Sequence, residues 1–183
     1  TPRHLVTASM YQQIPTRLGG HVDEYFLFTD ACCHLLDVVT HLCGKLRSIK
    51  AVAQKNESQL YSDVAAALVF ENGCVGTLSH GGVGGRLDTQ HPFQVVDIHT
   101  GLGRYCIENQ WDRMTFYPHD RAVREVFEPS VFVPRDYSVS MERACQAYLA
   151  AVDEGQNPPA GLSDALENMR AIEAMIASLR DRA

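Results

Sequence analysis

Acidic and imidazole side chains recur along one short segment of the chain. The residues Asp30, His34, Asp37 and His41 follow one another at intervals of four, three and four positions. At 3.6 residues per helical turn, this spacing places all of them on one face of a helix. A carboxylate one turn before an imidazole can orient the ring and tune its pKa, which suits proton transfer near neutral pH. The pattern indicates acid–base chemistry at Asp30 and His34, and a purely structural hydrogen bond is the plain alternative.

One helix over residues 29–44 is expected to carry these side chains. Thr29 or Asp30 can cap its start by accepting a bond from a free backbone N–H, and Gly44 can end it in a left-handed turn. The opposite side of the helix is apolar and predicts core packing. The residues on that side are Leu35, Val38, Val39 and Leu42.

Metal and nucleotide binding are weaker interpretations of the same sequence. Ligands on successive helical turns form a line along which only two neighbours reach one ion, so we expect no metal here. A metal-dependent hydrolase or lyase using this stripe remains an open third class. The glycine-rich run 81–85 follows a predicted strand, but residues 86–92 offer no helix to face a pyrophosphate. We therefore expect a loop there and no nucleotide site on this chain.

Composition limits the class of protein further. A chain of 183 residues with a net charge of −6 and no basic run fits one globular domain and argues against nucleic acid as a partner. No apolar run is long enough to span a membrane, and no leader for export is visible. Six cysteines without a Cys-x-x-Cys spacing predict reduced thiols and a cytoplasmic protein.

The order of elements predicts an α+β fold. Strands are expected over residues 3–11, 46–53, 63–70, 74–80, 93–99, 104–108, 111–117 and 122–127, a loop over 14–20, and helices over 139–154 and from 163 onward. Asn72-Gly73 between two β-prone runs is a strong hairpin signal. Strands and helices that do not alternate predict an open-faced, mainly antiparallel sheet with helices packed on one face. The other face is expected to pair with another copy, giving a homodimer or tetramer.

Several motifs, in order, resemble the C-terminal domain of the Gfo/Idh/MocA oxidoreductases, the glucose–fructose oxidoreductase and inositol dehydrogenase relatives. The helix motif is Asp30-x-x-x-His34-x-x-Asp37, ending Leu42-Cys43-Gly44. The segment 69–78 (VFENGCVGTL) is similar to that family's hairpin, and 96–103 (VDIHTGLG) to its later strand and turn. The segment 147–155 (AYLAAVDEG) followed by Pro158-Pro159 is similar to its closing helices.

The resemblance implies a two-domain enzyme whose N-terminal Rossmann half holds NAD or NADP. It implies that His34 takes or gives the hydroxyl proton of a sugar or polyol, and that Asp30 binds a substrate hydroxyl and positions His34. Asp37 would either have a structural role or make a further contact with the substrate. Residues 1–183 are then one substrate-binding and oligomerisation domain, a piece that lacks the N-terminal dinucleotide-binding domain. By itself this piece is expected to bind no cofactor. The alternative is a stand-alone, non-catalytic ligand-binding or dimerisation domain of the same fold.

Overall fold

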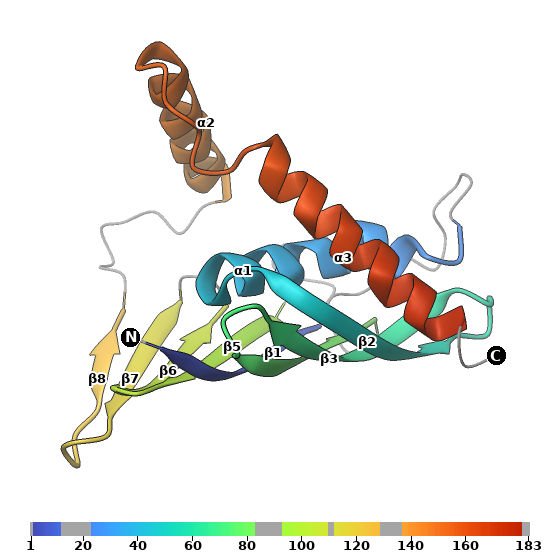
Figure 1. Ribbon diagram of the computed structural model, residues 1–183, viewed down its shortest axis with the longest axis horizontal. Coiled ribbons are helices and arrows are strands. Elements are labelled where there is room, and N and C mark those ends of the chain that lie inside the picture. The colour runs from blue at the N-terminus through green and yellow to red at the C-terminus, as the bar shows by residue number, and fades with distance from the viewer. Residues whose placement is uncertain (1, 12–22, 83–92, 110–111, 129–136, 181–183) are drawn as a thin grey trace.

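A computed structural model describes residues 2–11, 23–82, 93–109, 112–128 and 137–180 (Figure 1). The strands are Arg3–Tyr11 (β1), Leu46–Lys55 (β2), Tyr61–Phe70 (β3), Val75–Gly81 (β4), Phe93–Thr100 (β5), Gly103–Glu108 (β6), Arg113–Pro118 (β7) and Glu125–Phe127 (β8). The helices are a π-helical turn Leu27–Cys32 (η1) that continues into Cys33–Cys43 (α1), then Tyr137–Asp153 (α2) and Leu162–Arg180 (α3). The predicted loop over 14–20 and most of the glycine-rich run lie outside the described residues.

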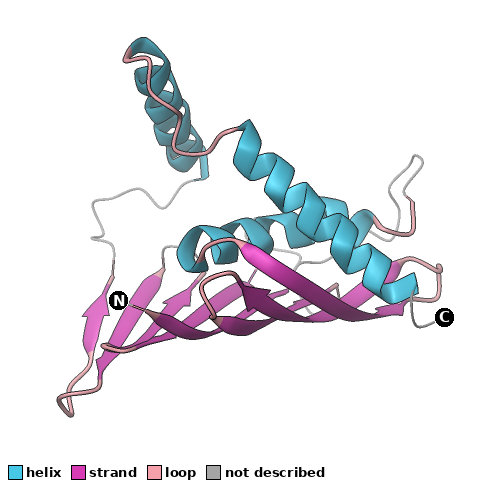
Figure 2. Ribbon diagram, viewed as in Figure 1, coloured by secondary structure: helices cyan, strands magenta, loops and turns pink. Residues whose placement is uncertain are grey.

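The strands form one sheet in the order β2-β3-β4-β1-β5-β6-β7-β8. Every neighbouring pair is antiparallel except β1 and β4, which run parallel. The first strand therefore lies in the middle of the sheet, between the β3–β4 hairpin and the β5–β8 meander. Figure 2 shows the helical layer on one face of the sheet, which confirms the predicted α+β class and open-faced arrangement.

Close approach of β1 and β4 explains one glycine of the hairpin motif. Gly76 is paired with Val6, and a Cβ added to Gly76 would lie 2.5 Å from the Val6 carbonyl oxygen. Any larger side chain at this position would push the two strands apart.

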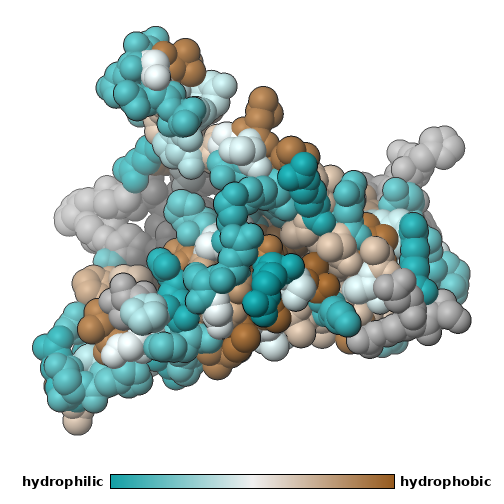
Figure 3. Space-filling view, in the orientation of Figure 1, coloured by the Kyte–Doolittle hydropathy of each residue, from teal (hydrophilic) through white to brown (hydrophobic). Residues whose placement is uncertain are grey.

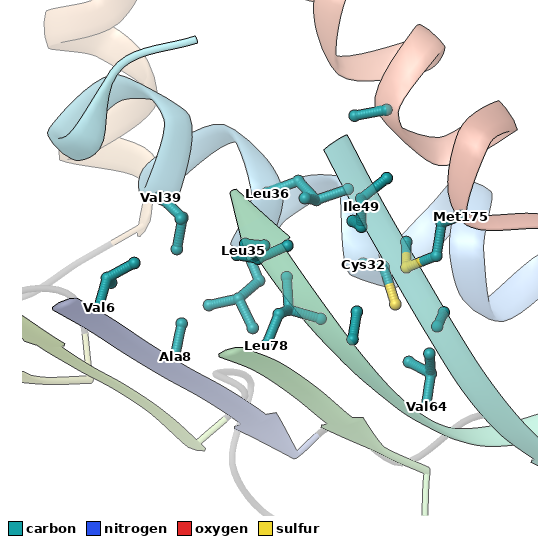
Figure 4. Packing of buried hydrophobic residues seen from close by; sticks show 14 of the residues in the cluster. Val6, Ala8, Cys32, Leu35, Leu36, Val39, Ile49, Val64, Leu78 and Met175 are labelled. Carbon is teal, nitrogen blue, oxygen red and sulfur yellow. The ribbon is translucent and has the colours of Figure 1, made fainter. Parts of the chain in front are cut away.

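The core lies between the sheet and α1 together with α3. Leu35 and Val39 of α1 point onto Val6, Ala8 and Leu78 of the sheet (Figure 4). The buried residues alternate along the strands and recur at helical intervals along α1, because each element turns one apolar side inward. The core prediction for α1 is thus confirmed, with Val38 and Leu42 half-buried.

The start of the first helix differs from the prediction. The π turn begins at Leu27, so the N-cap position is Phe26, and no side chain makes a capping hydrogen bond there. Thr29 and Asp30 lie inside the helix, so the predicted cap at either residue is wrong. The end is as predicted: Gly44 has φ +96° and its N–H donates to the Thr40 carbonyl.

Helix α2 does not pack on the sheet with the other two helices. Figure 1 shows it projecting away from the body of the domain, and its apolar side chains Met141, Tyr148, Leu149 and Val152 are exposed. The first part of α3 is exposed as well, with Leu162 at 91%. Brown residues are visible where α2 connects to α3 in Figure 3. Among the described residues no helix is long and apolar enough to cross a membrane.

Candidate active site

The predicted stripe lies on the outer side of η1 and α1, away from the sheet. Its four members, Asp30, His34, Asp37 and His41, are all exposed. No hydrogen bond or ion pair joins their side chains to one another within the part of the chain that the structure describes. All four side chains are thus open to solvent, but the expected contact between the Asp30 carboxylate and His34 is not made.

A π turn separates the first two members of the stripe. Asp30 lies inside η1, whereas His34 lies in the first turn of α1. A π turn is wider than an α turn, so residues four apart are not stacked one above the other as they are in an α-helix. π turns occur mainly as single interruptions of α-helices and are frequent at functional sites, which draws attention to this end of the stripe.

Two asparagines from other elements hold the helix in place by its backbone. The Asn72 side-chain amide donates to the Cys43 carbonyl at 2.7 Å, while its oxygen accepts from the Cys74 N–H at 3.0 Å. The Asn168 amide of α3 donates to the Cys33 carbonyl at 3.0 Å, where η1 meets α1. The hairpin motif thus has a role that its turn signal did not reveal, because it satisfies a free carbonyl at the helix end.

Two polar side chains are buried on the helix-facing side of the sheet, below this end of α1. His80 is 2% exposed and Gln94 is 1% exposed. No ring nitrogen of His80 and no side-chain amide atom of Gln94 has a hydrogen-bond partner among the described residues. Burial lowers the pKa of His80 to about 4; a positive charge on His34 acts in the same direction and Asp63 opposes it. His80 is therefore neutral at pH 7, and it lies within electrostatic range of His34.

Sequence reasoning missed both of these buried residues. His80 ends the inward-facing series Gly76, Leu78, His80 on β4, and Gln94 begins the inward-facing series of β5. The alternation of the strands was a usable signal, since it places each side chain on the covered face.

The second half of the stripe borders a different feature. Asp37 and His41 line a cleft of about 520 Å³ between the end of α1, the start of β2 and α3. An ion pair between Lys45 and Glu167 at 2.5 Å crosses this region. The structure thus divides the stripe, with His34 near His80 and the later pair at the cleft. Within the described residues, no three His, Cys, Asp or Glu side chains are placed to hold one metal ion.

The comparisons give the fold a context. No protein-family model matches the sequence, and no curated protein sequence matches it. Among solved structures, levoglucosan dehydrogenase in complex with NADH and levoglucosan matches 100% of this chain and 58% of its own, at 13% identity and a TM-score of 0.82. An oxidoreductase from Agrobacterium radiobacter in complex with NAD+, L-tartaric acid and magnesium matches 99% of this chain and 56% of its own, at 15% identity and a TM-score of 0.82.

A third structure is similar over nearly the same span. UDP-N-acetylglucosamine 3-dehydrogenase from Acidithiobacillus ferrooxidans matches 97% of this chain and 54% of its own, at 15% identity and a TM-score of 0.77. The chain therefore spans a little more than half the length of these structures. The fold is that of one part of such oxidoreductases, as the resemblance predicted.

Proposed function

We propose that the chain is the substrate-binding and oligomerisation domain of a nicotinamide-dependent oxidoreductase of the Gfo/Idh/MocA type, acting on a sugar, polyol or related hydroxy compound. The observation that carries the proposal is the match of the whole fold to just over half of several NAD-linked dehydrogenases. The ordered motifs, and an exposed Asp30/His34 pair on the outer side of a helix with a π turn, add support.

The unpacked surface of α2 fits a further domain. Large apolar residues of α2 and of the first turns of α3 are exposed, and a patch of this kind normally marks an interaction site. A dinucleotide-binding domain is the expected occupant, and it would supply NAD or NADP.

Chemical roles follow from side-chain type and placement. The nicotinamide, when bound, gives or accepts a hydride at the substrate carbon. His34 would hold or receive the proton of the substrate hydroxyl, because an imidazole ring has one nitrogen that can donate a proton and one that can accept it. Asp30 would accept a hydrogen bond from a substrate hydroxyl and bring its carboxylate beside His34. Asp37, at the border of the cleft between α1, β2 and α3, would support the helix or contact a distant part of the substrate.

A second copy of the chain is the proposed partner at the bare face of the sheet, forming a homodimer or tetramer. The free state of all six cysteines fits a reducing, cytoplasmic compartment.

The test uses protein expressed from the complete reading frame that contains this chain. Affinity for NAD(H) and NADP(H) is measured by fluorescence, and turnover is measured with a panel of sugars and polyols. We expect His34→Asn to lower kcat by about 10²–10⁴-fold, the usual contribution of general acid–base catalysis, while cofactor affinity is unchanged. His41→Asn is the matched control, since it removes an exposed imidazole from the same face of the same helix.

Each result has a clear meaning. Loss of turnover in His34→Asn alone supports the proposal. Full activity in His34→Asn would make the stripe structural. Absence of nicotinamide binding in the wild-type protein would favour the stand-alone ligand-binding domain.

A further inference from the structure

Two buried polar side chains lie in one row across the covered face of the sheet. His80 of β4 and Gln94 of β5 are both register partners of Met10, which lies between them on β1. Neighbouring strands are about 4.8 Å apart, so the Cα atoms of the two polar residues are separated by roughly 10 Å. Their side chains stand on the same covered face, at the end of β4 and at the start of β5.

Both side chains are costly in the free protein. An imidazole and a primary amide buried without hydrogen-bond partners lose their hydration and gain nothing in return. The equivalent inward-facing positions one step along each strand are the apolar residues Leu78 and Val96. Because apolar residues would fill these positions at lower cost, the polar pair points to a partner outside the chain.

The chemistry of the pair defines the kind of group that fits. A neutral imidazole offers one donor and one acceptor, and a primary amide offers both as well. A hydroxyl group also donates and accepts, so hydroxyls complement both side chains. Neither His80 nor Gln94 carries a charge at pH 7, so the pair itself offers no cation to a carboxylate or phosphate.

We propose that His80 and Gln94 form a hydroxyl-recognising subsite for a neutral polyhydroxy substrate, set beneath the helix end that carries His34. The subsite deepens the function proposed above and rests on it. His80 and Gln94 determine which substrate binds and how it is oriented, while proton transfer belongs to His34. Neutral sugars and polyols are therefore preferred over sugar acids and phosphorylated sugars.

The experiment compares His80→Met and Gln94→Met with the wild-type protein from the complete reading frame. Methionine keeps nearly the same volume and removes the polar atoms, so the core stays filled. Leu78→Met is the matched control, because it changes a buried residue on the same strand and face. Levoglucosan and L-sorbose serve as neutral probes and L-tartrate as the acidic probe; KM, kcat, cofactor affinity and thermal stability are measured for each variant.

We expect each polar-to-methionine variant to raise KM for the neutral probe that the enzyme uses by at least tenfold. We further expect kcat to change less than threefold, cofactor affinity to stay the same and the melting temperature of the free protein to stay equal or rise. Unchanged KM in both variants, with turnover intact, overturns the subsite and leaves the proposed function standing. A lower melting temperature of the variants with an unchanged KM also overturns the subsite, because the two side chains would then only bind an ordered internal water.

Failure of the proposed function is visible separately, as a wild-type protein that binds no nicotinamide cofactor. In that case equilibrium binding of the neutral probes, followed through the His80 imidazole resonance, decides the question. Binding that is lost in both variants supports the subsite, whereas equal binding in the variants or none in the wild type overturns it.

Discussion

His80 shows how one side chain can connect stability to the site. Its ring is almost fully buried, and neither nitrogen has a partner among the described residues. Burial lowers its pKa from 6.5 to about 4, with the charge of His34 adding to the effect and the Asp63 carboxylate opposing it. The folded protein therefore keeps this imidazole neutral over a pH range in which the unfolded chain protonates it.

The first prediction concerns the pH dependence of stability. Between pH 6.5 and about 4 the unfolded chain binds a proton at His80 that the folded chain does not bind, so the free energy of unfolding falls as the pH is lowered. Over the whole window the loss due to this group is about 3 kcal/mol, and above pH 6.5 its contribution is constant. Urea unfolding of the chain at several pH values measures this slope.

The His80→Met variant should lose this part of the slope and should be most stabilised relative to the wild type at the acidic end. Leu78→Met changes a buried residue on the same strand and face without removing a titratable group, so it should keep the wild-type slope. Equal slopes in the wild type and in His80→Met would show that burial does not hold this ring neutral.

At the scale of elements, the β3–β4 turn holds the helix that carries the candidate catalytic residues. Asn72 both closes its own turn, through the Cys74 N–H, and binds the last carbonyl of α1 at Cys43. The Glu71 N–H donates to the Lys45 carbonyl just after the helix, at 2.9 Å. The position of His34 along the sheet therefore depends on a hairpin that is more than 30 residues away in sequence.

The second prediction separates the two bonds of Asn72. Asn72→Asp keeps an oxygen for the Cys74 N–H but replaces the donor to Cys43 with a negative charge at the C-terminal end of a helix, where the dipole disfavours it. We expect a loss of about 1–2 kcal/mol in the free energy of unfolding. Hydrogen exchange should become faster in the last turn of α1.

Asn56→Ala is the control for that variant. The Asn56 side chain accepts from the Ser58 and Leu60 N–H groups in the β2–β3 turn, so its loss also weakens a hairpin. It should leave exchange in α1 unchanged. Faster exchange of α1 in both variants would mean that the helix end responds to general destabilisation and is not held by Asn72.

Elements defined by local pattern were predictable from the sequence, and those defined by distant contacts were not. The Asn72-Gly73 hairpin and the β5–β8 meander follow from alternation and turn residues, which act over a few positions. The parallel pairing of β1 with β4 depends on a gap of more than 60 residues and has no local signal. The π turn was missed because Thr29 and Asp30 are residue types that commonly cap a helix, so the helix was predicted to start there. In the structure both residues lie inside the π turn.

The site was predictable to the same extent. The stripe from Asp30 to His41 followed from helical spacing alone, and all four of its side chains are exposed. Gln94 and His80 become neighbours of Met10 only through the strand order, so their common row requires the tertiary structure. Nothing in the spacing of two residues on separate strands reveals that β1 lies between them.

At the scale of the whole molecule, the two faces of the sheet differ. The helices η1, α1 and α3 cover one face over β1 to β4, and no described helix lies on the opposite, bare face (Figure 1). On that bare face the β2-β3-β4-β1 half presents mostly small and apolar side chains together with Lys50, Gln54 and Asp63, whereas the β5–β6 part carries Asp97 paired with Arg104. Exposed side chains of the first half include Leu5, Val52, Ala65, Ala67, Val75 and Thr77.

The last prediction concerns assembly through this face. Thr77 is exposed near the middle of the sheet, between Thr7 on β1 and Ala67 on β3. In a pair of chains packed face to face, an arginine here would place a long charged side chain inside the contact between the two sheets, where taking it out of water costs several kcal/mol. We expect the wild-type chain to be a dimer or larger in light scattering and sedimentation equilibrium, and Thr77→Arg to weaken association by at least about tenfold. The control is Gln146→Arg, which adds the same charge on α2, away from the sheet. A monomeric wild type, or an unchanged assembly in Thr77→Arg, would assign the bare face to solvent or to a different partner.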